Sequence, residues 1–182
     1  MISNKKVRKI YIVLTHTGTI LSRLIKYYTQ EEFSHISIAF DENLDEMYSF
    51  GRRNAYNPFI GGFVREGIDF GTFKRFSNTK AAIYSFEVTD KQYKKIKKIV
   101  NKMERKKYLY KFNFIGLFAV SLNIKVSRQN HFYCAEFVKY LIDESKIELD
   151  LPQIVKPGDF IGLEGFELKY NGVLKNYKEV DY

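Results

Sequence analysis

The chain holds a single cysteine, Cys134, at the point where a polar loop gives way to a helical pattern. In the stretch HFYCAEFVKYLI, an apolar stripe runs through Ala135, Val138, Leu141 and Ile142, which places Cys134 in the first helical turn. Unpaired backbone N–H groups and the positive end of the helix dipole favour a thiolate there, and we expect an accessible thiol. A free cysteine is also commonly a small buried side chain, so position alone leaves both interpretations open.

A reactive thiol needs a base, and the chain has three histidines. His131 stands just before Cys134 in the loop or cap region, and His16 lies at the end of a predicted strand. His35 belongs to the alternating segment SHISIAFD, where it lies on the strand face opposite the apolar side chains. A cysteine and a histidine far apart in the sequence are a weak signal, because an ordinary hydrogen-bonded histidine is the simpler interpretation.

Residue patterns predict the elements that would position these side chains. Strands are expected over 7–14, 34–41, 47–52 and 81–88, helices over 19–29, 90–107 and from Cys134 onward, a buried helix within 110–124, mostly loop over 54–63, and loop with short strands over 151–174. Thr89 and Gln92 are spaced as a capping box before the second helix. The strands follow one another through turns or isolated helices without regular β–α–β alternation, which indicates an α+β fold.

Composition indicates one domain, spanning 1–182, with a full-sized core: 45% of its residues are hydrophobic and 16% aromatic. The basic start lacks the long apolar run and cleavage site of a signal peptide, and no stretch is long enough to span a bilayer. A lone cysteine calls for no oxidising compartment. We therefore expect a cytoplasmic protein; its oligomeric state is left open.

The net charge is +9, and much of it lies in the predicted helix over 90–107, where lysines alternate with an apolar stripe. A solvated surface helix is the ordinary interpretation of such a pattern. The alternative is a binding surface for anionic lipid or nucleic acid, which would add electrostatic attraction but no chemistry.

Two motifs in this order resemble a known family. LSRLIKYYTQEEFSHISIAF, followed much later by FYCAEFVKYLI, is similar to the circularly permuted branch of the NlpC-type papain-like superfamily, the YiiX-like amidases. In that branch a Ser-His strand precedes the cysteine helix. YLYKFNFIGLF, DEMYSFGRRNAYNPFIGGFVRE and VKPGDFIGLEGFELKYNGVLKNY resemble further family segments, so the similarity covers most of the chain. It implies a papain-like antiparallel sheet or partly rolled barrel with packed helices.

Carried over position by position, the resemblance implies that Cys134 is the nucleophile and His35 its base. The third position, which orients the histidine, falls on Ser49, where relatives often carry Glu. A serine can accept an imidazole N–H hydrogen bond but cannot stabilise an imidazolium by charge. Strand parity leaves Glu46 or Tyr48 as alternatives if the preceding turn is centred differently, with Glu46 the second choice.

The implied chemistry is thiol acyl transfer on an amide or ester carbonyl through a thioester. The Cys134 backbone N–H would hold the oxyanion together with a second donor, for which Tyr133 and His16 are candidates. No cofactor or metal is implied, because one cysteine and three dispersed histidines do not form a zinc-ligand set. Expected partners are a small-molecule, peptide or lipid-linked acyl substrate and an anionic membrane surface, without nucleic acid. The rival hypothesis is a non-catalytic papain-like module that binds anionic lipid or nucleic acid through its basic helix.

Overall fold

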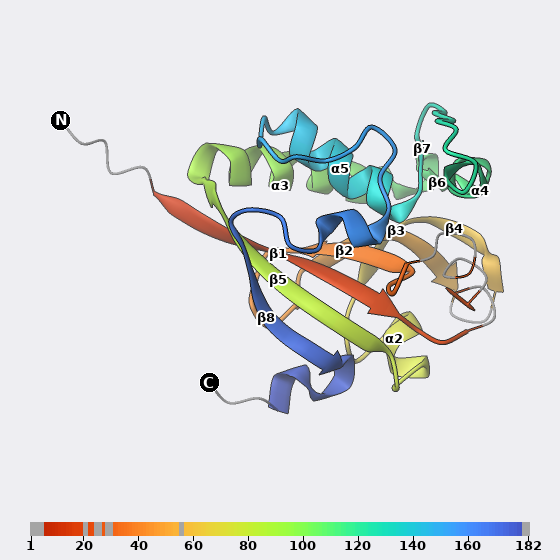
Figure 1. Ribbon diagram of the computed structural model, residues 1–182, viewed down its shortest axis with the longest axis horizontal. Coiled ribbons are helices and arrows are strands. Elements are labelled where there is room, and N and C mark those ends of the chain that lie inside the picture. Colours follow the sequence, from red (N-terminus) through yellow and green to blue (C-terminus); the bar gives the residue numbers. More distant parts are fainter. Residues whose placement is uncertain (1–5, 20–21, 24–26, 28–30, 55–56, 180–182) are drawn as a thin grey trace.

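A computed structural model describes residues 6–19, 22, 23, 27, 31–54 and 57–179 (Figure 1). In this part the α+β class is confirmed: helices pack on a mixed sheet of eight strands that does not close into a barrel. The strands are β1 (Val7–His16), β2 (His35–Ala39), β3 (Met47–Asn54), β4 (Asn57–Glu66), β5 (Lys80–Thr89), β6 (Lys111–Phe112), β7 (His131–Phe132) and β8 (Phe166–Val173). The helices are α2 (Gly71–Arg75), α3 (Asp90–Arg105), α4 (Phe114–Val120) and α5 (Cys134–Glu144), with 3-10 turns η1 (Lys107–Leu109), η2 (Pro157–Phe160) and η3 (Leu174–Glu179).

The strand order in the sheet is β7-β6-β4-β3-β2-β1-β5-β8. All neighbours are antiparallel except β6 and β7, which run parallel. The middle four strands form a meander from β1 to β4, so chain-adjacent segments also lie next to one another in the sheet. This arrangement places β2, which carries His35, near the centre.

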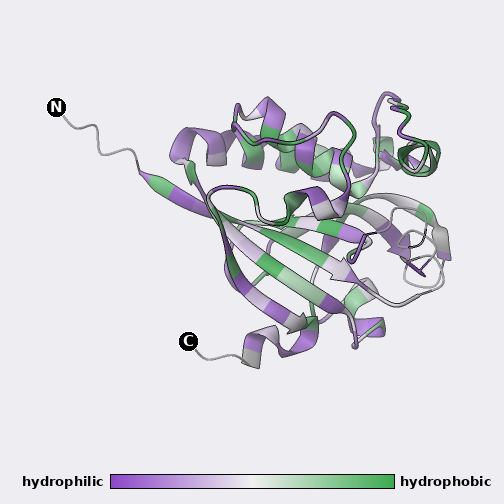
Figure 2. Ribbon diagram, in the orientation of Figure 1, coloured by the Kyte–Doolittle hydropathy of each residue, from purple (hydrophilic) through white to green (hydrophobic). Residues whose placement is uncertain are grey.

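The sheet separates two groups of buried side chains. The larger lies between the sheet and the layer of α3 and α5, which run along the same face (Figure 1); Phe50, Phe63 and Phe137 meet there at ring separations of 5.1–5.9 Å. The smaller lies on the other face against α2 and η3 and includes Met47 and Phe73. Figure 2 shows hydrophobic residues gathered on the central strands, while α3 and β8 carry more hydrophilic ones. Burial of both sheet faces fixes the register of the central strands.

One sequence expectation is wrong, and another is confirmed only in part. Most of the predicted loop over 54–63 is the strand β4, in which Gly61 and Gly62 permit a close approach: a Cβ on Gly62 would lie 2.4 Å from the carbonyl oxygen of Tyr110. The predicted buried helix within 110–124 is reduced to α4, on which Ile115 and Phe118 are more than half exposed.

The capping box before α3 is confirmed. The Gln92 backbone N–H donates to Thr89 Oγ1, and the Thr89 backbone N–H donates to Gln92 Oε1. Most of the predicted helix over 19–29 lies outside the described residues, although Ser22, Arg23 and Tyr27 are helical. Within the described ranges, no helix combines the length and apolar character needed to cross a membrane.

The glycine pair in β4 gives the first prediction. Gly62→Ala should destabilise the fold by about 1–3 kcal/mol, because the new methyl group meets backbone that cannot rotate away. Chemical denaturation of the full chain measures this. Ile60→Ala, at an exposed position on the same strand, should cost less than about 0.5 kcal/mol; equal costs for the two variants would contradict the packing argument.

Candidate functional site

The structure brings Cys134 and His35 together although they are far apart in sequence. Cys134 is the first residue of α5 and His35 is the first residue of β2. Both side chains line one cleft, and the thiol lies close enough to the imidazole to help raise its pKa. The ladder between β2 and β3 holds only the pairs Ile38–Tyr48 and Ala39–Met47. Because β3 does not pair with β2 at His35, the imidazole can reach the start of α5, which packs on both strands.

Glu66, the last residue of β4, is the third member of the site and contacts His35. His35 Nε2 lies 3.1 Å and 3.2 Å from the two Glu66 carboxylate oxygens. The Ser37 hydroxyl donates to Glu66 Oε2 at 2.6 Å and lies 3.3 Å from His35 Nε2. With Nε2 occupied by Glu66, Nδ1 is the ring nitrogen left for the thiol. The result is the sequence of contacts Cys134–His35–Glu66.

Neither residue predicted to orient the histidine does so. Ser49 lies on the same sheet face as His35, as the resemblance implied, but its buried Oγ makes no hydrogen bond among the described residues. It is still close enough to Glu66 to help lower the pKa of that carboxyl. Glu46 lies elsewhere, paired with Lys97 of α3.

Sequence reasoning missed Glu66 because the segment before it was taken as loop. The register pairs Met47 with Glu66, so the carboxylate enters from the strand beyond β3 and on the same sheet face as Ser49. The usable signal was the alternation in FVRE, where Phe63 and Arg65 share one face and Val64 and Glu66 the other.

Gly51 leaves the space in which these groups meet. A Cβ at this position would lie 3.2 Å from Glu66 Oε1, 3.2 Å from Ser49 Oγ and 3.3 Å from His35 Cε1. A side chain on β3 at this point would collide with both the imidazole ring and the carboxylate. Because Gly51 has no side chain, His35 of β2 and Glu66 of β4 can form their contact across β3.

Charge is stabilised on both partners. Burial disfavours the imidazolium, but the Glu66 carboxylate and the hydrogen-bonded Cys134 outweigh it and raise the pKa of His35 to about 10. Burial likewise disfavours the carboxylate, but His35, the hydrogen bond from Ser37 and the nearby hydroxyl of Ser49 hold the pKa of Glu66 below its usual range. Both shifts favour an imidazolium paired with a carboxylate at neutral pH.

Cys134 is buried, with 3% of its surface exposed, which corrects the expectation of an accessible thiol. It is reached through a narrow cleft with about 60 Å³ of space, room for only a few water molecules. The cleft is lined by Thr17, Ser22, Ser34, His35, Gly51, Arg52, Gly61, Glu66, Thr72, Phe112, Phe114, Leu117 and Cys134.

The remaining candidates from the sequence do not line this cleft. Tyr133 is buried, and its pKa is raised by burial and by the charges of Glu136 and Cys134. His16 Nδ1 lies 3.2 Å from the hydroxyl of Ser34, which does line the cleft. His131 Nδ1 lies 2.7 Å from the carbonyl oxygen of Gln129 in its own loop.

Neither a scan against protein-family models nor a search of curated proteins finds a match for this chain. Among the residues that the structure describes, no group of three or more His, Cys, Asp or Glu side chains is placed to hold a metal ion.

The His35–Glu66 pair gives the second prediction. Glu66→Gln should lower the pKa of His35 markedly, because burial then acts against the imidazolium without the carboxylate to oppose it. NMR titration of the imidazole in the full chain measures the change. Ser49→Ala, which keeps the carboxylate, is the matched control; an unchanged His35 titration in Glu66→Gln would contradict the assigned pairing.

The same pair sets a pH window for stability. The raised pKa of His35 stabilises the fold fully below its ordinary value of about 6.5 and loses this contribution as the pH rises toward about 10. The lowered pKa of Glu66 contributes above its ordinary value of about 4.3 and is lost at lower pH. The stability gap between wild type and Glu66→Gln should therefore be widest between about pH 5 and 6.5 and narrow toward about pH 10.

Proposed function

We propose that this chain is a cysteine hydrolase or acyl transferase that attacks an amide or ester carbonyl through Cys134. The single observation that carries the proposal is that Cys134, His35 and Glu66 line one cleft, with His35 between the thiol and the carboxylate. A nucleophile, a base and an acid that orients the base are the three parts that thiol acyl transfer requires.

In the proposed reaction, His35 holds the proton and Cys134 attacks as the thiolate. A sulfur–carbon bond forms, and the tetrahedral intermediate collapses when the carbon–nitrogen or carbon–oxygen bond breaks. The imidazolium gives its proton to the leaving amine or alcohol. His35 then takes a proton from water, or from an acceptor alcohol or amine, which attacks the thioester and releases the acyl group.

The Cys134 backbone N–H, at the positive end of α5, is the first oxyanion donor in this proposal. Ser34 is the candidate for the second donor, because its hydroxyl lines the same cleft and is held by His16. It replaces the two earlier candidates: Tyr133 lines no part of this cleft, and His16 reaches it only through Ser34.

The order of elements supports assignment to the circularly permuted NlpC-type papain-like class. The histidine strand β2 comes early in the chain, the cysteine helix α5 comes late, and α5 packs on the sheet that contains β2. Glu66, at the end of strand β4, supplies the charged partner of the histidine that relatives often carry and that an uncharged serine at position 49 cannot supply.

The cleft favours substrates with a slender reacting end. Its walls combine apolar side chains of Phe112, Phe114 and Leu117 with polar groups around the thiol. A space of about 60 Å³ holds only a reacting carbonyl and a few neighbouring atoms, so the rest of a peptide or lipid-linked acyl substrate must extend outside.

The third prediction tests the contact chain. With an activated acyl ester, Cys134→Ala should abolish thioester formation, and His35→Ala should slow it about 10²–10⁴-fold, as expected for loss of a positioned base. Glu66→Gln should be slower than wild type, while Ser49→Ala should cost far less than His35→Ala. Mass spectrometry of the intact protein measures acylation.

Non-additivity provides a second readout. The double variant of Cys134→Ala and His35→Ala should be hardly worse than Cys134→Ala alone, because residues that act as one unit do not add. Full acylation in His35→Ala, combined with its loss in His131→Ala, would refute the assignment of the base and with it the proposed site.

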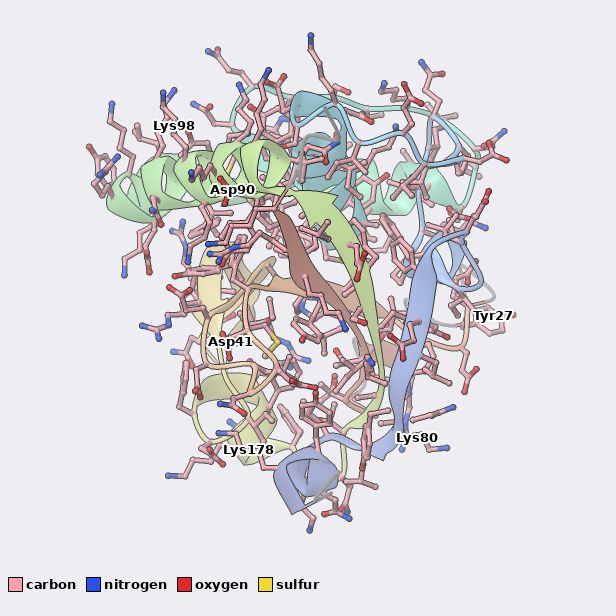
Figure 3. All side chains as sticks on the ribbon, turned by 90° about the vertical axis from the view of Figure 1, so that its left-hand side faces the viewer. Tyr27, Asp41, Lys80, Asp90, Lys98 and Lys178 are labelled. Atoms are coloured by element: carbon pink, nitrogen blue, oxygen red, sulfur yellow. The ribbon has the colours of Figure 1, made fainter. Side chains whose placement is uncertain are left out.

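A second candidate function is peripheral binding to an anionic surface through α3. Lys91, Lys98 and Lys102 are exposed on this helix, and Figure 3 shows Lys98 directed away from the molecule. Three other lysines of α3 are already paired: Lys94 with Asp90, Lys95 with Glu144 and Lys97 with Glu46. The exposed lysines are therefore the ones available to lipid headgroups.

The fourth prediction follows from those lysines. Reversal of Lys98 and Lys102 to Glu should weaken binding to vesicles of anionic phospholipid, most strongly at low salt where surface charge is less screened. Reversal of Lys80 and Lys175, exposed at the opposite end of the sheet, changes net charge equally and should have a smaller effect. Co-sedimentation with vesicles at several salt concentrations measures the binding. If the wild-type protein shows no salt-dependent binding, this second candidate function is refuted.

A further inference from the structure

Arg52 places a positive charge in the cleft that the proposed reaction does not use. It follows Gly51 on β3, is partly buried, and lines the same cleft as Cys134 and His35. Its neighbour Arg53 is exposed and donates instead to the carbonyl oxygens of Lys107 and Tyr110. Adjacent arginines on one strand thus have different surroundings, and of the two only Arg52 lines the cleft that contains the thiol.

The Arg52 side chain is held in place by neutral groups. One terminal guanidinium nitrogen donates to the hydroxyls of Thr17 at 3.3 Å and Thr19 at 3.0 Å. The guanidinium carbon lies 5.4 Å from the centre of the Phe76 ring, a cation–π distance. Both hydrogen bonds leave from the same nitrogen. Among the described residues, the other donors of the guanidinium make no hydrogen bond and can serve another partner.

Arg52 also has no dedicated counter-ion in the described part of the chain, where no carboxylate lies within ion-pair distance of it. Burial lowers the pKa of Arg52, and the charge of Glu66 acts against that effect. The Glu66 oxygens, however, are already bound by His35 and Ser37. A partly buried guanidinium with unused donors and no paired anion favours an anion from outside.

We propose that Arg52 is a specificity-determining residue that binds an anionic group, a carboxylate or a phosphate, on the acyl substrate close to its reacting carbonyl. This inference rests on the proposed function, and it narrows the substrate class to anionic amides or esters. The fixed fork of Arg52 suits two oxygens of one anion, which would orient the substrate with its carbonyl toward Cys134.

Matched esters test the proposal by rate. The para-nitrophenyl monoester of glutaric acid carries a carboxylate, the para-nitrophenyl ester of valeric acid is a neutral analogue of similar length, and the ester of phosphonobutyric acid carries a phosphonate. Wild type should prefer the anionic esters in kcat/KM by about 10–100-fold, the range of a charge-assisted hydrogen bond. The carboxylate and phosphonate arms distinguish the two sources of the anion.

Variants assign that preference to one side chain. Arg52→Gln should reduce the ratio of anionic to neutral kcat/KM to near one, mainly through KM, and Arg52→Lys should restore part of it. Arg53→Gln removes the same charge from the neighbouring residue outside the cleft and should keep the ratio. A wild type without preference, or an equal loss on both esters in Arg52→Gln, would overturn the inference.

Binding separates this inference from the proposed function. In Cys134→Ala, which cannot react, glutaric acid monoamide should bind more tightly than valeramide in an NMR titration, and the additional change Arg52→Gln should remove the difference. If that difference appears while no ester acylates wild type, the anion site stands and the proposed chemistry fails. If the esters acylate Cys134 but neither rates nor binding distinguish charge, the chemistry stands and the anion site fails.

Discussion

The ion pair between His35 and Glu66 is the interaction on which the site depends. Removal of two charges from water is costly, and their attraction compensates only when geometry and further hydrogen bonds are good. Here Nε2 faces both carboxylate oxygens, and Ser37 adds a short hydrogen bond. Loss of either partner would leave the other charge partly buried and unpaired. Each residue therefore needs the other in order to remain charged in the site.

This pair imposes demands on the sheet around it. His35 and Glu66 belong to strands separated by β3, so β3 must not place a side chain between them, and Gly51 meets that demand. The backbone of β4 must also approach that of β6 closely, which Gly61 and Gly62 permit because they carry no side chain. The glycines that made this region resemble a loop are thus the condition for the strand that carries the acid.

An element can be predicted from the sequence when the residues that determine it lie close together along the chain. The helix at Cys134 and the alternation around His35 depend on neighbours a few residues away, and both elements are present. The partner of His35 depends on the register between β3 and β4, which no local pattern specifies once β4 is taken as loop. Ser49 was therefore placed on the correct face, yet a carboxylate from the next strand reaches the ring instead.

The causes of the raised His35 pKa differ in how long they would last during the proposed reaction. Glu66 is permanent, whereas the contribution of Cys134 depends on a thiol or thiolate beside the ring. Acylation converts that sulfur to a neutral thioester, which removes its charge and its hydrogen bond, while burial continues to act against the imidazolium. The proton on His35 is thus held most firmly before attack and more loosely once the sulfur–carbon bond has formed. One histidine can therefore stabilise the thiolate, then protonate the leaving group, and then act as a base toward water, because the sulfur beside it loses its charge when the sulfur–carbon bond forms.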